Sequence, residues 1–396
     1  MRQGPPRRTA ERLARGGNVG NIGILTFHWA DDCGAMLQAY ALRRRLELLG
    51  ERAEIIPYAP VKLTGRYWLC PLWAVPGEGG LRCSFQWNLF KQNLLLGRQY
   101  FARRRHMRAF RHRYLTPRLP IRGAEKISLF PYKTVLIGSD QVWNPDITVD
   151  LDDAYIGNIP RRGSCRLVSY GASLGGNSLS PEQRQAFSRY VGEFSAVSLR
   201  EQADTAWVGR LLGRQVRSVL DPVLLLERPE WERIAKDFGV GDAVVLYLTE
   251  PNEALLRCAR ALSAYLGKRI VSLSRPPYLS ERFQDGKPVP GVDIRADAGP
   301  AEFLGCLRDA CCVLTNSFHA TSFSILLEKP FLTFPHSTRN LRLEDLLRKL
   351  GLLSHLTETD RPDGAMEIWT GTDWDQVRAR LAAEREASVR FLMEAI

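Results

Sequence analysis

The chain has 396 residues, which is too many for one ordinary hydrophobic core, so we expect two domains. Its 45% hydrophobic and 25% charged residues are typical of a soluble globular protein, and no run approaches the roughly 18 apolar residues of a membrane-spanning helix. The net charge of +12 makes anionic partners the first class to consider.

The N-terminal residues 1–18 are basic and lack the apolar core of a signal peptide, so we predict a disordered tail there. The eight cysteines form no C-x-x-C pair, and Cys311 and Cys312 are adjacent in an apolar segment. This distribution argues against a zinc site and against a disulfide framework. We therefore expect a cytoplasmic protein.

Residues 19–226 alternate apolar strands with helices and predict an N-terminal α/β domain. Its first elements are a strand at 22–27, a helix at 35–49 and a strand at 53–57. Four further strands, separated by helices, are predicted at 134–137, 167–170, 196–199 and 217–220.

An insertion at 60–118 interrupts this domain with a Trp-rich stretch and an amphipathic helix. Tyr100, Met107, Phe110 and Tyr114 recur at helical spacing, which leaves one strongly basic face on that helix. The face is either a solvated surface or a contact for an anionic partner. Because no nucleic-acid-binding module accompanies it, nucleic acid is not an expected partner.

A second series at 240–370 predicts a C-terminal α/β domain, and the final segment 371–396 is predicted to be a helix that packs back on the first domain. The strands of this domain are expected at 243–248, 269–273 and 312–315, and its helices at 252–266, 300–310 and 317–327. Strands that alternate with helices form parallel sheets covered on both faces. The predicted fold class is therefore α/β, with two doubly wound, Rossmann-like domains that face each other across a cleft.

Polar residues follow several predicted strands, at the sheet edge where ligands of doubly wound domains gather. Each of these positions alone is compatible with ordinary turn chemistry. Together they favour an active cleft, because hydroxyls, amides and an aromatic face suit a sugar. In the first domain the residues are His28, Asp32, Ser139, Asp140, Trp143 and Asn144.

The segment 315–334 places a histidine where a buried strand turns into a helix. Asn316 or Ser317 can cap this helix, and His319 lies in its first turn. Backbone N–H groups at a helix start lack intrahelical partners and attract anions. The arrangement suggests proton transfer on a phosphate or a carboxylate, although a packed histidine in an ordinary strand–helix unit fits this segment equally well.

Seven motifs occur in order between Asn21 and Leu353. They are G-I-L-T-F-H, G-A-M-L-Q-A-Y-A-L, G-S-D-Q-V-W-N-P, S-Y-G-A-S, V-S-L-R-E, L-D-P-V-L-L-L and N-S-F-H-A-T-S-F-S-I-L-L-E-K-P-F. Each motif is modest, but their order and spacing make the set specific. In this combination the chain resembles the polysaccharide pyruvyl transferase family.

The resemblance implies a fold similar to that of GT-B glycosyltransferases, with the acceptor on the first domain and the donor on the second. It also implies that the enolpyruvyl group of phosphoenolpyruvate is transferred onto two hydroxyls of one sugar, which forms a pyruvate ketal and releases phosphate. Phosphoenolpyruvate is then a donor substrate, and no cofactor is expected. The acceptor would be a polysaccharide or a lipid-linked glycan precursor, and a lipid-linked acceptor would bring the protein to the inner face of an anionic membrane.

The same resemblance assigns roles to individual residues. His319 and Arg200 would hold or protonate the donor. The remaining donor-binding residues would be Asn316, Ser317, Phe318, Arg339 and Lys329, where Arg339 stands in for a lysine of some relatives. The acceptor would contact His28, Asp32, Ser139, Asp140, Trp143 and Asn144.

Asp32 and Cys33 depart from the family pattern, since many relatives have N-Y-G-A where this chain has D-C-G-A. An aspartate cannot donate a hydrogen bond as an asparagine can. Two alternatives therefore stay open: a GT-B glycosyltransferase that uses a nucleotide sugar, and a non-catalytic glycan-binding relative. Asp150 and Asp152 match a D-x-D metal pair only superficially, so no metal is predicted.

Overall fold

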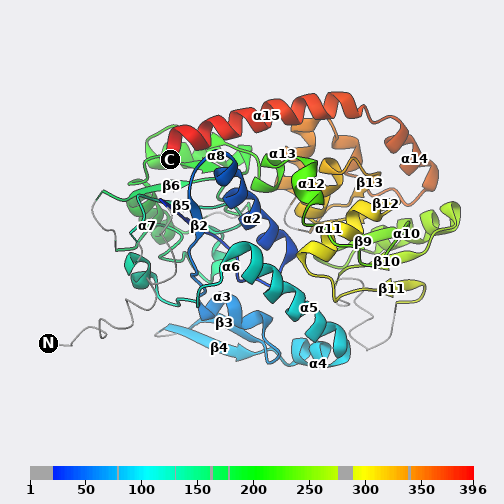
Figure 1. The fold of residues 1–396 in the computed structure, drawn as a ribbon, viewed down its shortest axis with the longest axis horizontal. Coiled ribbons are helices and arrows are strands. Elements are labelled where there is room, and N and C mark those ends of the chain that lie inside the picture. Colours follow the sequence, from blue (N-terminus) through cyan, green and yellow to red (C-terminus); the bar gives the residue numbers. More distant parts are fainter. Residues whose placement is uncertain are drawn as a thin grey trace.

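The computed structural model describes residues 21–77, 80–129, 131–160, 164–176, 179–274, 289–337 and 340–396. Two parallel sheets lie side by side, one built from each half of the chain (Figure 1). The predicted α/β fold class with parallel sheets is confirmed. The predicted tail at 1–18 lies outside the described residues.

The first sheet has the strand order β2-β1-β5-β6, and every pairing in it is parallel. Its strands are β1 (Ile22–Leu25), β2 (Ala53–Ile55), β5 (Thr134–Ile137) and β6 (Arg166–Ser169). Two isolated bridges, Val168 to Ala196 and Ala172 to Leu199, connect it to the short parallel pair β7 (Ser198–Leu199) and β8 (Arg217–Ser218). Strands beside one another in this order all end at the same edge.

Neighbouring residues of these strands are buried in different hydrophobic clusters. Ile24, Leu136 and Val168 belong to one cluster, whereas Leu25, Ile137 and Leu167 belong to another. A strand buried on both faces appears in the sequence as a continuous apolar run rather than an alternating one. This explains why these strands were predictable.

The second sheet has the order β11-β10-β9-β12-β13, again with parallel pairings only. Its strands are β9 (Val244–Tyr247), β10 (Ile270–Ser272), β11 (Val292–Ile294), β12 (Cys312–Thr315) and β13 (Phe331–Thr333). The edge strand β11 was not predicted. Its residues are only partly buried, so it lacks the apolar run that marks the central strands.

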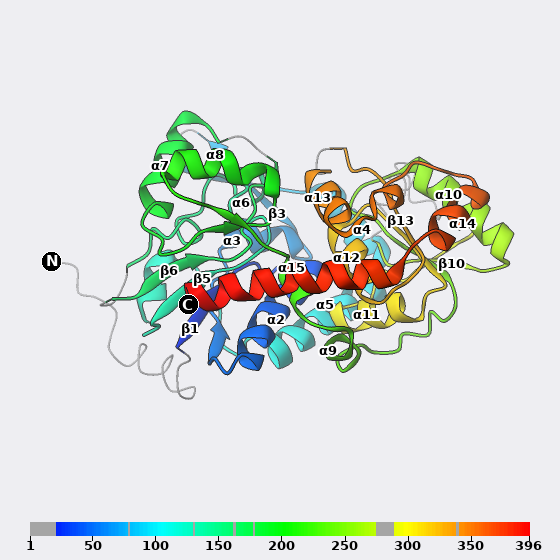
Figure 2. The same cartoon turned by 90° about the horizontal axis from the view of Figure 1, so that it is seen from above.

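Helices cover both sheets (Figures 1 and 2). Those of the first half are α2 (Cys33–Leu48), α6 (Pro145–Thr148), α7 (Pro181–Val191) and α8 (Gln202–Leu212). Those of the second half are α9 (Arg228–Glu232), α10 (Glu253–Leu266), α11 (Pro300–Asp309), α12 (Phe318–Leu326), α13 (Leu341–Leu350) and α14 (Pro362–Thr370).

The last helix, α15 (Trp374–Ala395), spans both halves of the molecule in Figure 2. Its Ser388 Oγ accepts a hydrogen bond from Leu220 N at 2.9 Å, and Arg385 Nε donates to Leu224 O at 2.8 Å. Val377 and Leu392 of this helix belong to the same buried cluster as Ile24 of the first sheet. The helix therefore ties the end of the chain to the first domain.

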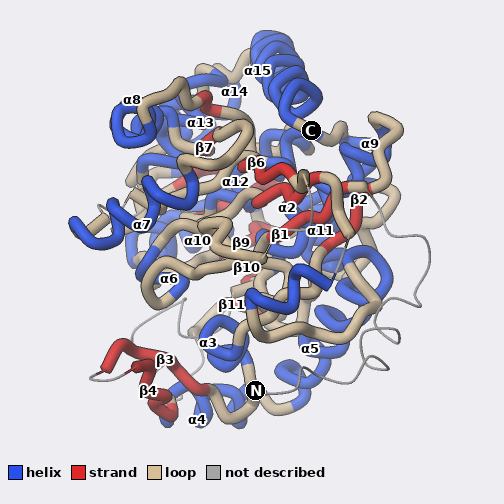
Figure 3. The backbone as a smooth tube through the Cα atoms, turned by 90° about the vertical axis from the view of Figure 1, so that its left-hand side faces the viewer, coloured by secondary structure: helices blue, strands red, loops and turns tan. Residues whose placement is uncertain are grey.

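The insertion forms the lower edge of the molecule in Figures 1 and 3. Its elements are α3 (Val61–Thr64), the antiparallel hairpin β3 (Leu72–Gly77) and β4 (Gly80–Phe85), α4 (Trp87–Leu96) and α5 (Arg98–Phe110). The basic helix predicted over 98–118 thus ends as an α-helix at Phe110 and continues as a π turn to Leu115.

Part of the basic face of α5 holds the two domains together. Arg103 donates to Ala298 O at 2.8 Å and to Asp31 O at 3.1 Å. Gln99 donates to Ile294 O and accepts from Ala296 N. The basic face of α5 is therefore not only a solvated surface, because α5 also connects the first domain to the second sheet.

Leu392 of α15 is fully buried, whereas its neighbour Met393 is 57% exposed. We expect Leu392→Ala to lower the free energy of unfolding by about 2–5 kcal/mol, because it leaves a cavity under α15. Met393→Ala is the matched control and should stay within about 0.5 kcal/mol of the wild type. Urea unfolding of the two variants measures the difference, and equal effects would show that α15 is not packed as described.

Candidate active site

A cavity of about 170 Å³ lies between the two domains, at the edge where the strands of both sheets end. Its walls come from the loops after β1 and β5, the starts of α2 and α12, and the loop after β9. From the first domain it is lined by Phe27, Ala30, Asp32, Gly34, Ala35, Arg66, Tyr67, Asp140, Gln141 and Ile147. From the second it is lined by Tyr247, Thr249, Asn316, Ser317, Phe318, His319 and Arg342.

A larger cavity of about 400 Å³ shares a wall with the first, since Asp32, Arg66, Tyr67, Ile147, Tyr247 and Thr249 line both. It runs beneath the insertion, where Trp73, Leu89, Leu96 and Tyr100 line it. The two cavities form one continuous cleft. His319 lines the smaller part, whereas the larger part is lined by aromatic and aliphatic side chains together with charged ones such as Arg103, Arg104 and Asp146.

The start of α12 is held rigidly but leaves its amides uncapped. Ser317 occupies the N-cap position without a side-chain hydrogen bond to the helix. Asn316 Oδ1 instead accepts from Thr249 N at 2.8 Å, and Asn316 Nδ2 donates to Glu250 O at 3.0 Å. Asn316 thus joins the ends of β12 and β9, and the amides of the first turn stay available to an anion at the cavity wall.

Asp221 is the buried centre of the polar network behind the cavity. Its Oδ2 accepts from Arg200 Nη1 at 2.8 Å and from Ser139 Oγ at 3.1 Å. Its Oδ1 accepts from Val223 N at 3.0 Å. His319 Nε2 lies 3.8 Å from Oδ2, which is an ion-pair distance when the imidazole is protonated and too long for a hydrogen bond.

The pKa of Asp221 reflects this surrounding. Burial alone would raise the pKa of the carboxyl, but His319, Arg200 and the Val223 amide hold it well below its ordinary value. Asp221 is therefore a permanent negative charge at neutral pH. Its Oδ2 faces His319 Nε2, and Asp221 itself is not among the residues that line the cavity.

Arg200 is buried and has unused donors. Its guanidinium stacks over the Phe318 ring at 4.9 Å and lies 3.5 Å from Glu201 and 3.9 Å from Asp140. Among the described residues, its Nε and Nη2 atoms have no hydrogen-bond partner, and neither has His319 Nε2. Buried donors without partners are rare in folded proteins and indicate a missing ligand or water. Arg200 and His319 are thus brought together as sequence reasoning expected.

Gly34 lets the two domains approach closely at the cavity. A Cβ atom at this position would lie 2.0 Å from His319 Nδ1, so the ring rests directly on the backbone of α2. Next to it, Asp32 caps α2 by accepting from Ala35 N at 2.9 Å. The glycine of the D-C-G-A turn is therefore required by the position of His319, whereas Cys33 is buried and does not line the cavity.

Asp140 lines the cavity in a strained conformation. Its φ is 79°, which a non-glycine residue rarely adopts. Its carbonyl accepts from Ser173 N, and its carboxylate accepts from Gln141 N at 2.8 Å. Strain of this kind persists where the surrounding structure imposes it, and it often occurs at functional positions.

Three residues expected to contact an acceptor are placed elsewhere. Trp143 is fully buried between Phe187 and Phe194 and donates to Tyr155 O, so it cannot present a face to a sugar. That prediction was wrong, because the indole is part of the core beneath the loop. Ser139 Oγ donates its hydrogen bond to Asp221. The side chain of Asn144 caps α6 by accepting from Asp146 N, and its Nδ2 donates to Gln141.

His28 is also buried completely, with Nδ1 at 3.0 Å from Thr26 O. Burial lowers the pKa of this histidine to about 3. A ring without solvent contact that stays neutral at physiological pH is a structural element of the loop rather than an acceptor contact.

Lys329 is not brought to His319. Lys329 follows the C-terminal end of α12, the far end from His319, and donates to Ala310 O at 2.9 Å. Arg339 lies outside the described residues. Arg342, which was not predicted, lines the cavity at the start of α13.

Asp221 was missed as a functional candidate, although it lies in the L-D-P-V-L-L-L motif. An acidic residue before a proline is also a common N-cap, and Asp221 does cap the 3-10 helix Pro222–Leu225. Only the fold reveals that its second oxygen faces Arg200 and His319. In the described part of the chain, no group of three or more metal-ligating side chains is arranged to hold a metal ion.

Residues 32–338 match the family described as polysaccharide pyruvyl transferase. The chain belongs to the polysaccharide pyruvyl transferase family. Membership implies a transferase of polysaccharide biosynthesis and a glycan acceptor. A comparison with curated proteins returns no match.

Solved structures resemble this polysaccharide pyruvyl transferase family member only distantly. The UDP-GlcNAc 2-epimerase of Methanocaldococcus jannaschii is 13% identical, with a TM-score of 0.49 over 94% of this chain and 99% of that chain. The glycosyltransferase SnogD of Streptomyces nogalater is 11% identical, with a TM-score of 0.41 over 95% and 99%. At these levels of similarity, neither structure informs the reaction of this chain.

We expect Gly34→Ala to destabilise this family member by about 1–3 kcal/mol, because its methyl group would overlap the His319 ring. In the His319→Ala background the same change should become neutral or stabilising, since alanine favours a helix over glycine by about 1 kcal/mol. Urea unfolding of the four proteins in this cycle measures the coupling. Equal destabilisation in both backgrounds would contradict the contact.

His28 should make stability depend on pH. In the unfolded chain it takes up a proton below its ordinary pKa of 6.5, but in the folded chain only near pH 3, so its contribution is full above pH 6.5 and falls as the pH drops towards 3. Between pH 7 and pH 5 we expect the wild type to lose about 2 kcal/mol more than His28→Asn, which keeps an N–H donor for Thr26 O. Unfolding curves with parallel pH dependence would show that His28 is not buried in the neutral form.

Proposed function

We propose that this chain transfers the enolpyruvyl group of phosphoenolpyruvate onto two hydroxyls of one sugar in a polysaccharide or lipid-linked glycan precursor. The product is a cyclic pyruvate ketal, and inorganic phosphate is released. The observation that carries this proposal is the position of His319 in an uncapped helix start at the cavity wall, with Asp221 and the buried guanidinium of Arg200 directly behind it.

Donor binding requires positive charge and N–H groups, because phosphoenolpyruvate carries both a phosphate and a carboxylate. The amides at the start of α12 supply N–H groups, and Arg342 supplies a cation at the same cavity. Arg200 approaches from behind the Phe318 ring, with donors that no described residue satisfies. In this proposal Arg342 meets one anionic group of the donor at the cavity wall, and Arg200, which lies behind that wall beside Asp221, adds positive charge from a second side.

Ketal formation needs an acid. A proton added to C3 of the enolpyruvyl group makes C2 electrophilic, and a sugar hydroxyl then attacks C2. Phosphate leaves with the electrons of the C2–O bond, and the second hydroxyl closes the ring at the same carbon. An imidazole suits the acid role near neutral pH, and the Asp221 carboxylate would hold its protonated form in place.

Sugar binding is assigned to the first-domain wall. Asp32 and Asp140 line the cavity with carboxylate oxygens that can accept hydrogen bonds from hydroxyls. Gln141 adds an amide beside them. The aromatic ring at this wall is Tyr67 rather than the buried Trp143. In this proposal Asp140 receives a hydroxyl proton, since its carboxylate lines the same cavity as His319.

His319→Ala should reduce ketal formation by at least about 10²-fold, since a general acid typically contributes that much or more. His112→Ala, which removes an exposed histidine just after α5, is the matched control and should retain activity. The assay measures phosphate release from phosphoenolpyruvate and the pyruvyl mass gain of a panel of glycosides.

Circular dichroism of both variants checks that they fold. Full turnover by His319→Ala would contradict the assigned acid. Release of a nucleotide from a sugar nucleotide by the wild type, without turnover of phosphoenolpyruvate, would overturn the proposed reaction in favour of glycosyl transfer. Binding of glycosides without turnover of either donor would identify a non-catalytic relative.

A further inference from the structure

The insertion exposes a group of apolar side chains along one edge of the molecule. Figure 3 shows the backbone of this edge at β3, β4 and α4. Trp87 is 55% exposed, Leu95 63% and Phe101 60%. Six of the twelve large hydrophobic side chains that are exposed in the described part of the chain belong to this surface: Trp73, Phe85, Trp87, Leu94, Leu95 and Phe101. Large exposed apolar patches mark interaction sites.

Helix α4 carries apolar side chains on its outer side as well as on the side that faces the cavity. Trp87, Leu94 and Leu95 are exposed together with Lys91. In contrast, Asn93 is buried and donates to Trp68 O and Leu69 O at 3.2 Å each. A surface helix of a globular protein normally has a polar outer side, with its apolar side chains towards the core. The outer side of α4 is therefore built for a partner.

Positive charge surrounds these apolar side chains. Residues 80–122 contain no aspartate or glutamate. The exposed basic residues on this stretch are Arg82, Lys91, Arg98, Arg105, Arg108, Arg113 and Arg122, and no ion pair is recorded for them among the described residues. Lys91 lies over the Trp87 ring at 5.5 Å. Aromatic and aliphatic side chains mixed with unpaired basic residues match the chemistry of an anionic lipid surface.

Other partners fit less well. A second copy of this surface would bring like charges together, and an acidic glycan or a nucleic acid would leave Leu94 and Leu95 without a matching group. A bilayer satisfies both features at once, because its headgroups are charged and its acyl boundary is apolar.

The surface is continuous with the catalytic cleft. Leu89 and Leu96 on the inner side of α4 line the 400 Å³ cavity, together with Trp73. That cavity shares Asp32 and Tyr247 with the one beside His319. A protein docked through α4 would therefore hold the mouth of its cleft at the membrane.

We propose that the surface formed by β3, β4, α4 and the start of α5 docks on an anionic bilayer, so that the cleft receives a glycan carried on a lipid anchor. The docking itself is independent of the reaction, whereas the identity of the acceptor rests on the proposed function. Basic residues near an anionic surface each strengthen binding about fivefold, and the apolar side chains add a part that salt does not remove.

The test is co-sedimentation of the full chain with vesicles of phosphatidylglycerol and phosphatidylcholine, without any substrate. The wild type should bind in proportion to phosphatidylglycerol content and more weakly at high salt. Lys91→Gln with Arg98→Gln should weaken binding about thirtyfold. Trp87→Ser with Leu95→Ser should weaken binding at low and high salt alike.

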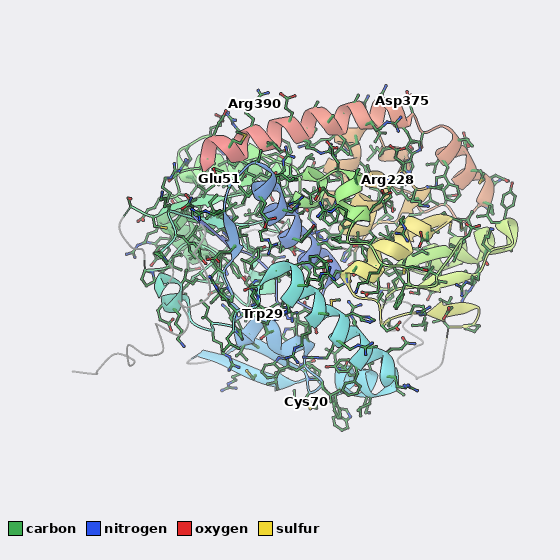
Figure 4. All side chains as sticks on the ribbon, viewed as in Figure 1. Trp29, Glu51, Cys70, Arg228, Asp375 and Arg390 are labelled. Carbon is green, nitrogen blue, oxygen red and sulfur yellow. The ribbon has the colours of Figure 1, made fainter. Side chains whose placement is uncertain are left out.

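The control combines Arg390→Gln with Met393→Ser on α15, at the opposite edge of the molecule, where Figure 4 labels Arg390. This variant should bind vesicles like the wild type. Binding that ignores lipid charge, or that all variants retain, would overturn the proposal. Self-association that the α4 variants abolish, without vesicle binding, would instead assign the surface to a second copy. Turnover of a soluble glycoside, measured separately, tests the proposed reaction whatever the vesicles show.

Discussion

The structure of the cleft depends on one buried carboxylate. Asp221 lies in the segment that joins the two domains, and taking its charge out of water is costly unless it is compensated on several sides. The compensation comes from Ser139 after β5, Arg200 after β7 and His319 after β12. These residues belong to both domains. Moving the domains apart would leave the charge of Asp221 less well compensated, so the relative position of the domains and the geometry of the site depend on each other.

The structure of the start of α2 explains how this chain accommodates Asp32 and Cys33, where many relatives have an asparagine and a tyrosine. The oxygen of Asp32 that caps α2 performs a task that an asparagine oxygen performs equally well. Cys33 faces the core, so its replacement of a tyrosine does not alter the cavity wall directly. The chemical difference is confined to the second oxygen of Asp32, which can accept a hydrogen bond from a sugar hydroxyl but cannot donate one. Under the proposed function, this change would affect the choice of acceptor rather than the proton transfer assigned to His319.

Sequence reasoning predicted the central strands and the strand-end clusters, because strands buried on both faces leave an apolar run that ends in polar residues. Sequence reasoning failed where the prediction depended on the direction in which a side chain points. Trp143 follows β5 as closely as Asp140 does, yet the tight turn sends Asp140 into the cavity and Trp143 into the core. The role of Asp221 was equally hidden, since its partners are distant in the sequence and a cap residue before proline needs no further explanation.

In the insertion too, the sequence does not reveal which way side chains point. The insertion also connects the exposed surface at α4 to the cleft beside His319. A helical pattern in α4 and α5 cannot distinguish a face that joins domains from a face that meets a partner. In the fold, Arg103 and Gln99 of α5 hold the second domain, while Trp87 and Lys91 of α4 face outward. Leu89 and Leu96 lie between these two faces and line the cleft. The same short helix therefore forms part of the outer surface and part of the cleft wall, which a helical pattern in the sequence alone does not reveal.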